Sequence, residues 1–273
     1  MSSLNQSRTL RITGLCITLL VATAAYAADA PVRFLYVGPQ DNTALDGARQ
    51  GLDEANLQGK FLGLEYTLDT VTPAEAATHA FDGYIAILSA GDAAQLETLS
   101  ARAGQRPVFN LTTPDDALRD ACLANVLHVI PSRRMLDDAV AQWHRKHPDA
   151  KVSAEAWHPD YVKFAGRDLN KRFRKAFNHP MDDYSWSGWA AVKMTSDSYA
   201  REGIHDPAAM LAYLRGPLQF DGQKGIEMNF RENGQLRQTL LIIENGHIAG
   251  EAPVRGVVDP DDLDSLGSAH CAK

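Results

Sequence analysis

The stretch "VRFLYVGP" (residues 32–39) decides the fold. Its first six residues are apolar except for one arginine, which is typical of a short buried strand, and Gly38-Pro39 ends that strand. Thr43 then caps a predicted helix, whose apolar residues recur at helical spacing at Leu45, Ala48, Leu52 and Ala55. The first unit of the chain is therefore predicted to be a strand followed by a helix.

This strand-then-helix unit recurs as far as Trp143. Four further strands are predicted at Leu64–Val71, Tyr84–Leu88, Val108–Leu111 and Val126–Ile130. Helices are predicted from Pro73, after Gly91 and after Ser132. Strands that alternate with helices indicate a doubly wound parallel sheet of the α/β class.

The pattern changes after Trp143. Residues 144–157 are mainly polar, and helices are predicted next at Tyr161–Phe177, at Tyr184–Arg201 and from Asp206-Pro207. These helices make up a C-terminal helical portion of the α/β domain.

Two Asn-Gly pairs mark the end of the chain. Asn233-Gly234 and Asn245-Gly246 separate apolar runs, and such pairs are a strong hairpin signal. We expect a small three-stranded antiparallel appendage over Gly222–Ile248. Residues 259–273 follow as an acidic tail, which we expect to be solvated.

The N-terminus predicts export. A polar lead with two arginines precedes an apolar run, and Ala25-Tyr26-Ala27 matches a cleavage site, so residues 1–27 are interpreted as a signal peptide. The whole chain has a formal net charge of −7. Losing Arg8 and Arg11 makes it more acidic, and an acidic chain argues against nucleic-acid binding. We predict a periplasmic protein without a membrane span in its mature chain.

Two cysteines remain after such cleavage, Cys122 and Cys271. An even pair in an oxidising compartment is most simply a disulfide. The alternative is two unpaired thiols, because pairing does not follow from sequence alone.

Catalytic and metal-binding patterns are weak. The chain lacks the common nucleophile, zinc-protease, phosphate-loop and dinucleotide motifs, so we predict that it is not an enzyme. The pairs Asp115-Asp116 and Asp182-Asp183 are interpreted as helix caps rather than catalytic carboxylates. No metal site is predicted. A basic stripe, formed by Arg167, Lys171, Arg174 and Lys175, is read as a solvated face, with an acidic partner or ligand as the alternative.

Polar side chains follow three of the predicted strands. In open α/β sheets, ligands bind outside the carboxyl ends of the strands. The loops at Gly38–Asn42, Ser89–Asp92 and Asn110–Asp116 offer hydroxyls, amides and helix N-termini, which suit a carboxylate. The predicted ligand-binding residues here are Gln40, Ser89, Asn110, Thr112 and Thr113, although the same residues can serve as helix caps.

Two segments resemble a known family. The pattern "VGPQDNTALDGARQGLDEANLQGKFLG" (Val37–Gly63) is similar to the opening of type I periplasmic solute-binding proteins of branched-chain amino acid ABC importers. "FDGQKGIEMNFRENGQLRQTLLIIENG" (Phe220–Gly246) resembles the terminal hairpin of that family. The resemblance implies a solute-binding fold that ends in a small antiparallel addition.

A third segment, Phe109–Trp143, resembles the branch of this family associated with alcohol dehydrogenases that use pyrroloquinoline quinone (PQQ). The residues that carry this resemblance are Asn110, Asp116, Leu118-Arg119, Cys122, His128, Pro131-Ser132 and Cys271. It implies a solute such as PQQ, a small acid or an amino acid, with PQQ as a bound ligand rather than a required cofactor. Arg119, Arg133 and Arg134 are its predicted charge partners. Trp186 or Trp189 is a candidate for stacking, although both are better interpreted as core residues.

The chain departs from the family in one respect. Such proteins have two α/β lobes, whereas only residues 144–160 separate the predicted exit from the first lobe and the return to it. A second lobe needs on the order of ~100 residues, since each βαβ unit takes about 30. We therefore expect one binding-protein-like domain over residues 28–258, with 144–160 as the remnant of a second lobe. The expected partners are a membrane ABC permease or a PQQ dehydrogenase or cytochrome. The alternative function is a non-transporting accessory protein that docks on one of these.

Overall fold

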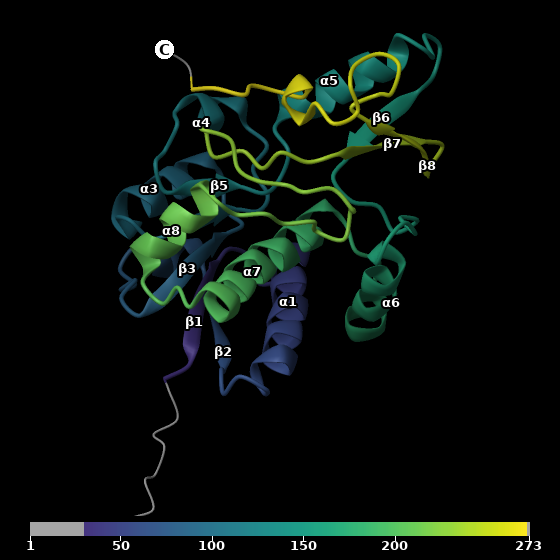
Figure 1. Ribbon diagram of the computed structural model, residues 1–273. Helices are drawn as coiled ribbons and strands as arrows, with labels where there is room; N and C mark the ends of the chain where they lie inside the picture. The colour runs from purple at the N-terminus through teal and green to yellow at the C-terminus, as the bar shows by residue number, and fades with distance from the viewer. Residues whose placement is uncertain (1–29, 272–273) are drawn as a thin grey trace, which may run out of the picture.

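The computed structural model describes residues 30–271, so the predicted signal peptide lies outside the described part. A five-stranded parallel sheet forms the centre (Figure 1). Its strands are β1 (Val32–Val37), β2 (Tyr66–Val71), β3 (Tyr84–Ser89), β4 (Val108–Asn110) and β5 (Val126–His128), in the order β2-β1-β3-β4-β5. The predicted α/β class and parallel sheet are confirmed.

Both faces of the sheet are covered by helices. Phe34 and Tyr36 point into a core with α1 (Thr43–Gly59), α7 (Asp183–Glu202) and α8 (Pro207–Arg215). Leu35 and Val37 point into a second core with α2 (Pro73–Ala76), α3 (Ala93–Ala103) and α4 (Asp116–Asp120). This alternation follows from the two-residue period of a strand, and it makes the sheet doubly wound.

Helix α1 begins one residue differently from the prediction. Asn42 is its N-cap, with the side-chain Oδ1 accepting a hydrogen bond from the N–H of Ala44 at 2.9 Å. Thr43 lies inside the first turn instead, where its hydroxyl donates to the carboxylate of Asp182 at 2.9 Å. The hydroxyl thus joins the starts of α1 and α7, two helices far apart in sequence.

Two glycines allow α1 and α7 to pack backbone to backbone. A Cβ atom on Gly47 would lie 1.8 Å from the carbonyl oxygen of Ser185, and one on Gly188 would lie 2.1 Å from that of Ala44. Neither distance is possible for a real side chain, so only glycine permits this approach.

The small antiparallel sheet differs in part from the predicted meander. The hairpin at Asn245-Gly246 is confirmed, joining β7 (Leu240–Glu244) to β8 (His247–Ala252). The third strand is β6 (Val152–Glu155), which pairs with β7. It replaces the strand expected before Asn233-Gly234, and it lies within residues 144–160.

Asn233-Gly234 does form a turn, but its flanks meet only in a single bridge between Phe230 and Leu236. Gln235 instead bridges in parallel to His128 of β5, and its side-chain Nε2 donates to the carbonyl oxygens of His128 and Ile130. The expected strand is absent because this segment bonds to the end of β5 instead.

Residues 133–177 contribute two more helices. Helix α5 (Arg133–His144) is capped by Ser132 as predicted. Helix α6 (Gly166–Phe177) begins later than the predicted Tyr161. No helix in residues 30–271 has the length and apolar character that crossing a membrane requires.

The acidic tail is docked rather than solvated. Leu263 and Leu266 are buried, and Asp264 accepts hydrogen bonds from Arg231 at 2.8 Å and Arg237 at 2.9 Å. Cys271 forms a disulfide with Cys122, with the Cα atoms 5.7 Å apart. The expectation of a solvated tail is wrong because apolar and charged contacts both fasten this segment to the domain.

Candidate functional site

The predicted strand-end residues gather at the carboxyl edge of the parallel sheet, but several are buried. Asn110 is 1% exposed, and its side chain donates to the carbonyl of Thr113 and accepts from the N–H of Thr113. The Thr113 hydroxyl donates to the carbonyl of Gly91 at 2.6 Å. These bonds tie the loop after β4 to the loop after β3. Asn110 and Thr113 therefore stabilise the loops of this edge from buried positions.

Ser89 ends β3 and is also buried. Its Oγ has no hydrogen-bond partner among the described residues. Gln40 is exposed and Thr112 is partly exposed at the same edge. Of the five predicted loop residues, Gln40 and Thr112 are therefore the ones whose side chains reach solvent.

Arg119 is buried beneath the loops of this edge. It is 2% exposed, and its guanidinium donates to Gln235 Oε1 and to the carbonyl oxygens of Thr113, Asp115 and Ile130, at 2.8–2.9 Å. Burial lowers its pKa to about 9, so it remains protonated at neutral pH. The expectation that Arg119 contacts a ligand is not supported, since these bonds hold loops together.

Arg133 and Arg134 lie exposed at the start of α5. The Arg133 guanidinium pairs with Asp115 at 3.0 Å, and the backbone N–H of Arg134 donates to Asp116. Both side chains remain accessible to a solute at this edge. Asp115 stands at the N-cap position of α4, but its side chain makes no capping hydrogen bond there. The Asp115 and Asp116 carboxylates bind groups of α5 instead, so the predicted capping of α4 by a side chain is wrong.

An acidic hollow of about 270 Å³ lies where α7 begins. Asp182 caps α7, as predicted, by accepting the N–H of Ser185 at 2.8 Å. Asp183 accepts the N–H of Trp157 at 2.7 Å, and burial raises its pKa to about 7. Glu155 also lines the hollow, and burial raises its pKa too. Sequence reasoning missed this grouping because β6 brings Glu155 to α7 only in the fold.

The two candidate stacking tryptophans are core residues. Trp186 and Trp189 are 0% and 1% exposed. Lys224 lies over the Trp186 ring with Nζ 4.3 Å from its centroid, and Nζ donates to Gln238 and to the carbonyl of Thr239. Burial lowers the pKa of Lys224 to about 7. The rings of both tryptophans are therefore packed inside the protein, and Lys224 covers the face of Trp186.

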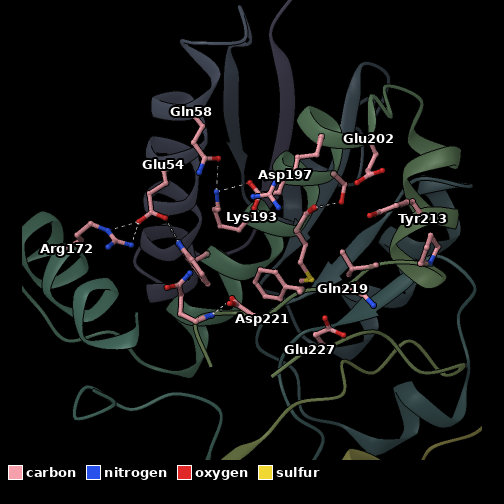
Figure 2. Close-up of a pocket in the computed structure, with 18 residues that line it drawn as sticks. Glu54, Gln58, Arg172, Lys193, Asp197, Glu202, Tyr213, Gln219, Asp221 and Glu227 are labelled. Atoms are coloured by element: carbon pink, nitrogen blue, oxygen red, sulfur yellow. Dashed lines mark hydrogen bonds and ion pairs between the residues drawn. The ribbon is translucent and has the colours of Figure 1, made fainter. Parts of the chain in front are cut away.

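A larger hollow, with a volume of about 680 Å³, lies between α1, α7, α8 and residues 217–227 (Figure 2). On one wall, Glu54 accepts from Arg172 and from the indole N–H of Trp189. Nearby, Lys193 donates to Asp197 at 2.9 Å and to Gln58 at 3.3 Å. Sequence reasoning missed this hollow because its walls come from segments more than a hundred residues apart.

Charges of both signs line this hollow. Its rim also carries Glu202, Asp221 and Glu227 (Figure 2). Its volume falls in the range of small-molecule sites, but its walls are more polar than is usual for them. In residues 30–271, no group of three or more His, Cys, Asp or Glu side chains is arranged to hold a metal ion.

Comparison with solved structures identifies the architecture. An ABC transporter substrate-binding protein from Desulfitobacterium hafniense aligns with a TM-score of 0.67 at 12% identity, over 80% of this chain and 99% of that chain. The fold is that of a periplasmic binding protein. No protein-family model and no curated protein matches the chain.

Two further solved structures share this binding-protein fold. A branched-chain amino acid ABC transporter periplasmic ligand-binding protein from Burkholderia xenovorans LB400 aligns with a TM-score of 0.68 at 10% identity, over 86% of this chain and 96% of that chain. A solute-binding protein from R. palustris, solved in complex with benzoate, gives 0.66 at 11% identity, over 82% and 96%. At such identities the likeness concerns the fold.

Proposed function

We propose that this chain is an exported solute-binding protein of an ABC-import-like system, and that it binds a small carboxylate-bearing solute at the carboxyl edge of its parallel sheet. The observation that carries the proposal is the binding-protein fold, with the loops after β3 and β4 fastened together at the edge where such folds take ligands. The D. hafniense protein was also solved in complex with Leu.

The solute class follows from the exposed cations at this edge. Arg133 and Arg134 are accessible, and a guanidinium can hold a carboxylate through two parallel hydrogen bonds. PQQ, a small acid or an amino acid would each supply that carboxylate. The resemblance of Phe109–Trp143 favours a link to PQQ-dependent alcohol oxidation in the periplasm, with a permease, dehydrogenase or cytochrome as partner.

A second candidate function is an accessory protein that docks on such a partner without carrying solute. One observation favours it: Asn110 and Thr113 are buried, and their polar atoms are bonded within the protein. The second lobe that would close over a ligand remains, in our interpretation, reduced to residues 144–160.

Isothermal titration of residues 28–273 with PQQ tests the proposal, together with thermal-shift measurements using leucine, benzoate and small acids. Saturable binding at submillimolar concentration is expected, and Arg133→Ala with Arg134→Ala should weaken it about tenfold or more, because a charge-assisted hydrogen bond contributes about 1.5–3 kcal/mol. Arg145→Ala is the control, as Arg145 is an exposed arginine at the other end of α5. No response to any solute would favour the docking function.

A further inference from the structure

Helix α6 carries an unusual charge for this protein. The chain has a formal net charge of −7, whereas α6 holds five basic residues and only Asp168 as an acid. Its apolar residues Leu169 and Phe173 are buried, and Asn170 donates to the carbonyl oxygens of His158, Pro159 and Tyr161. The helix is therefore held firmly on one side, and its opposite side is basic.

The basic side is defined by Arg167, Lys171, Arg174 and Lys175, and we call it the α6 basic face. All four are exposed, and they line a shallow hollow of about 400 Å³ together with Pro159 and Asn170. Within residues 30–271 none of the four forms an ion pair. By contrast, Arg172 on the same helix pairs with Glu54 at 2.9 Å.

Like charges three or four residues apart on a helix repel each other. Lys171 stands four residues from Arg167 and from Lys175, and three from Arg174. Two carboxylates lie near them. Asp168 stands on the same helix, three residues before Lys171. The pKa of Asp160 is lowered first by a hydrogen bond from His247 and to a lesser extent by Arg174. Four cations thus face two carboxylates, and in the described chain neither carboxylate forms an ion pair with any of the four, so the repulsion on this face is only partly offset.

We propose that the α6 basic face is a docking surface for an acidic segment of another protein. The cations from Arg167 to Lys175 extend along about 12 Å of helix, given a rise of 1.5 Å per residue. An extended peptide covers that length with about four residues. A short run of Asp or Glu thus matches the spacing of the four cations, and it would lie in the hollow beside Pro159.

The geometry favours a protein segment over a membrane surface. A helix that binds a bilayer inserts its apolar side, but Leu169 and Phe173 of α6 are already buried in the domain. The available surface is cationic and hollowed. Figure 1 shows α6 at the edge of the molecule, beside α1 and below the small sheet. The side chains of the α6 basic face are exposed there. This surface is separate from the strand-end edge, so the inference does not depend on solute binding.

The test uses a fluorescein-labelled hexaglutamate peptide and fluorescence anisotropy with the mature chain. Saturable binding is expected at about 20 mM NaCl and should weaken strongly by about 150 mM, because salt screens exposed charges. The variant Arg167→Gln/Lys171→Gln/Lys175→Gln should weaken binding about tenfold or more. The single variant Lys171→Glu should also weaken binding, because it reverses one of the four charges of the α6 basic face.

The matched control removes three charges elsewhere, as Lys60→Gln/Lys151→Gln/Arg255→Gln, all at exposed positions. It should change the affinity by about twofold or less, because only the local field of α6 attracts the acidic peptide to an acidic protein. Thermal unfolding of each variant checks the fold. An absence of binding at low salt, or an equal loss in both triple variants, would overturn the proposal. Binding to phosphatidylglycerol vesicles but not to the peptide would replace it with a membrane surface.

Discussion

Arg119 has a structural role, because its guanidinium joins separate loops of the domain. Its guanidinium reaches three backbone carbonyls and the Gln235 side chain, and these acceptors lie in the loop after β4, at the end of β5 and in the turn segment of residues 231–236. A buried guanidinium that satisfies several acceptors leaves each of them unpaired when it is removed.

We expect Arg119→Met to lower the free energy of unfolding by about 3 kcal/mol, the scale seen when a buried charged group with several partners is lost. Arg133→Met, at an exposed position in the neighbouring helix, should change it by about 0.5 kcal/mol or less. Urea denaturation followed by circular dichroism measures both. Equal effects of the two changes would contradict the framework role.

For single residues, the sequence predicted which side chains lie at the carboxyl edge of the sheet, but not which of them are buried and bonded within the protein. Asn110, Thr113 and Arg119 do lie near the carboxyl edge, since strand ends define that edge. Their burial could not be predicted, because the carbonyls that occupy their donors come from distant loops. A disulfide between Cys122 and Cys271 was the simpler of the two alternatives for the pair of cysteines that remains after the predicted cleavage, and the structure has it.

The contact between α1 and α7 offers a test at the scale of elements. Glycine inside a helix normally costs about 1 kcal/mol relative to alanine, so Gly188→Ala should stabilise a free helix. Here the added Cβ would collide with the carbonyl of Ala44. We therefore expect the opposite sign, a loss of about 1–3 kcal/mol in the free energy of unfolding, as for other overpacked contacts.

Thermal or urea unfolding measures this loss. Asp53→Ala, on the exposed side of α1, is the control and should leave stability within about 0.5 kcal/mol. If Gly188→Ala were neutral or stabilising, the close packing of the two helices would not hold in solution.

Helices and parallel strands were predictable because their periodicity is local. The small sheet was predictable only in its hairpin, where Asn245-Gly246 supplies positive φ angles of 52° and 79°. The pairing of β6 with β7 joins residues about ninety positions apart, from Val152 to Glu244. No local pattern distinguishes that pairing from one with the nearer segment before Asn233.

At the scale of the whole molecule, the disulfide holds the docked tail to the segment that follows α4. It joins cysteines 149 positions apart, and the loop-entropy model assigns about 4–5 kcal/mol to a loop of this size. We expect Cys122→Ser/Cys271→Ser to lower the free energy of unfolding by up to about that amount. Urea unfolding with and without dithiothreitol measures it, since only the wild-type protein should respond to the reductant.

Packing of α7 and α8 onto the parallel sheet also has a consequence for biosynthesis. The first five strands are complete once residue 128 has been made, yet the helices that cover one face of them end only at residue 215. Until then, α1 lies on this face without α7 and α8, and Phe34 and Phe109 lack the part of their cover that these two helices supply. The incomplete chain therefore exposes apolar surface of the sheet that favours aggregation. A truncated form that ends after α5 would keep this surface exposed, and it would need a chaperone to remain unaggregated.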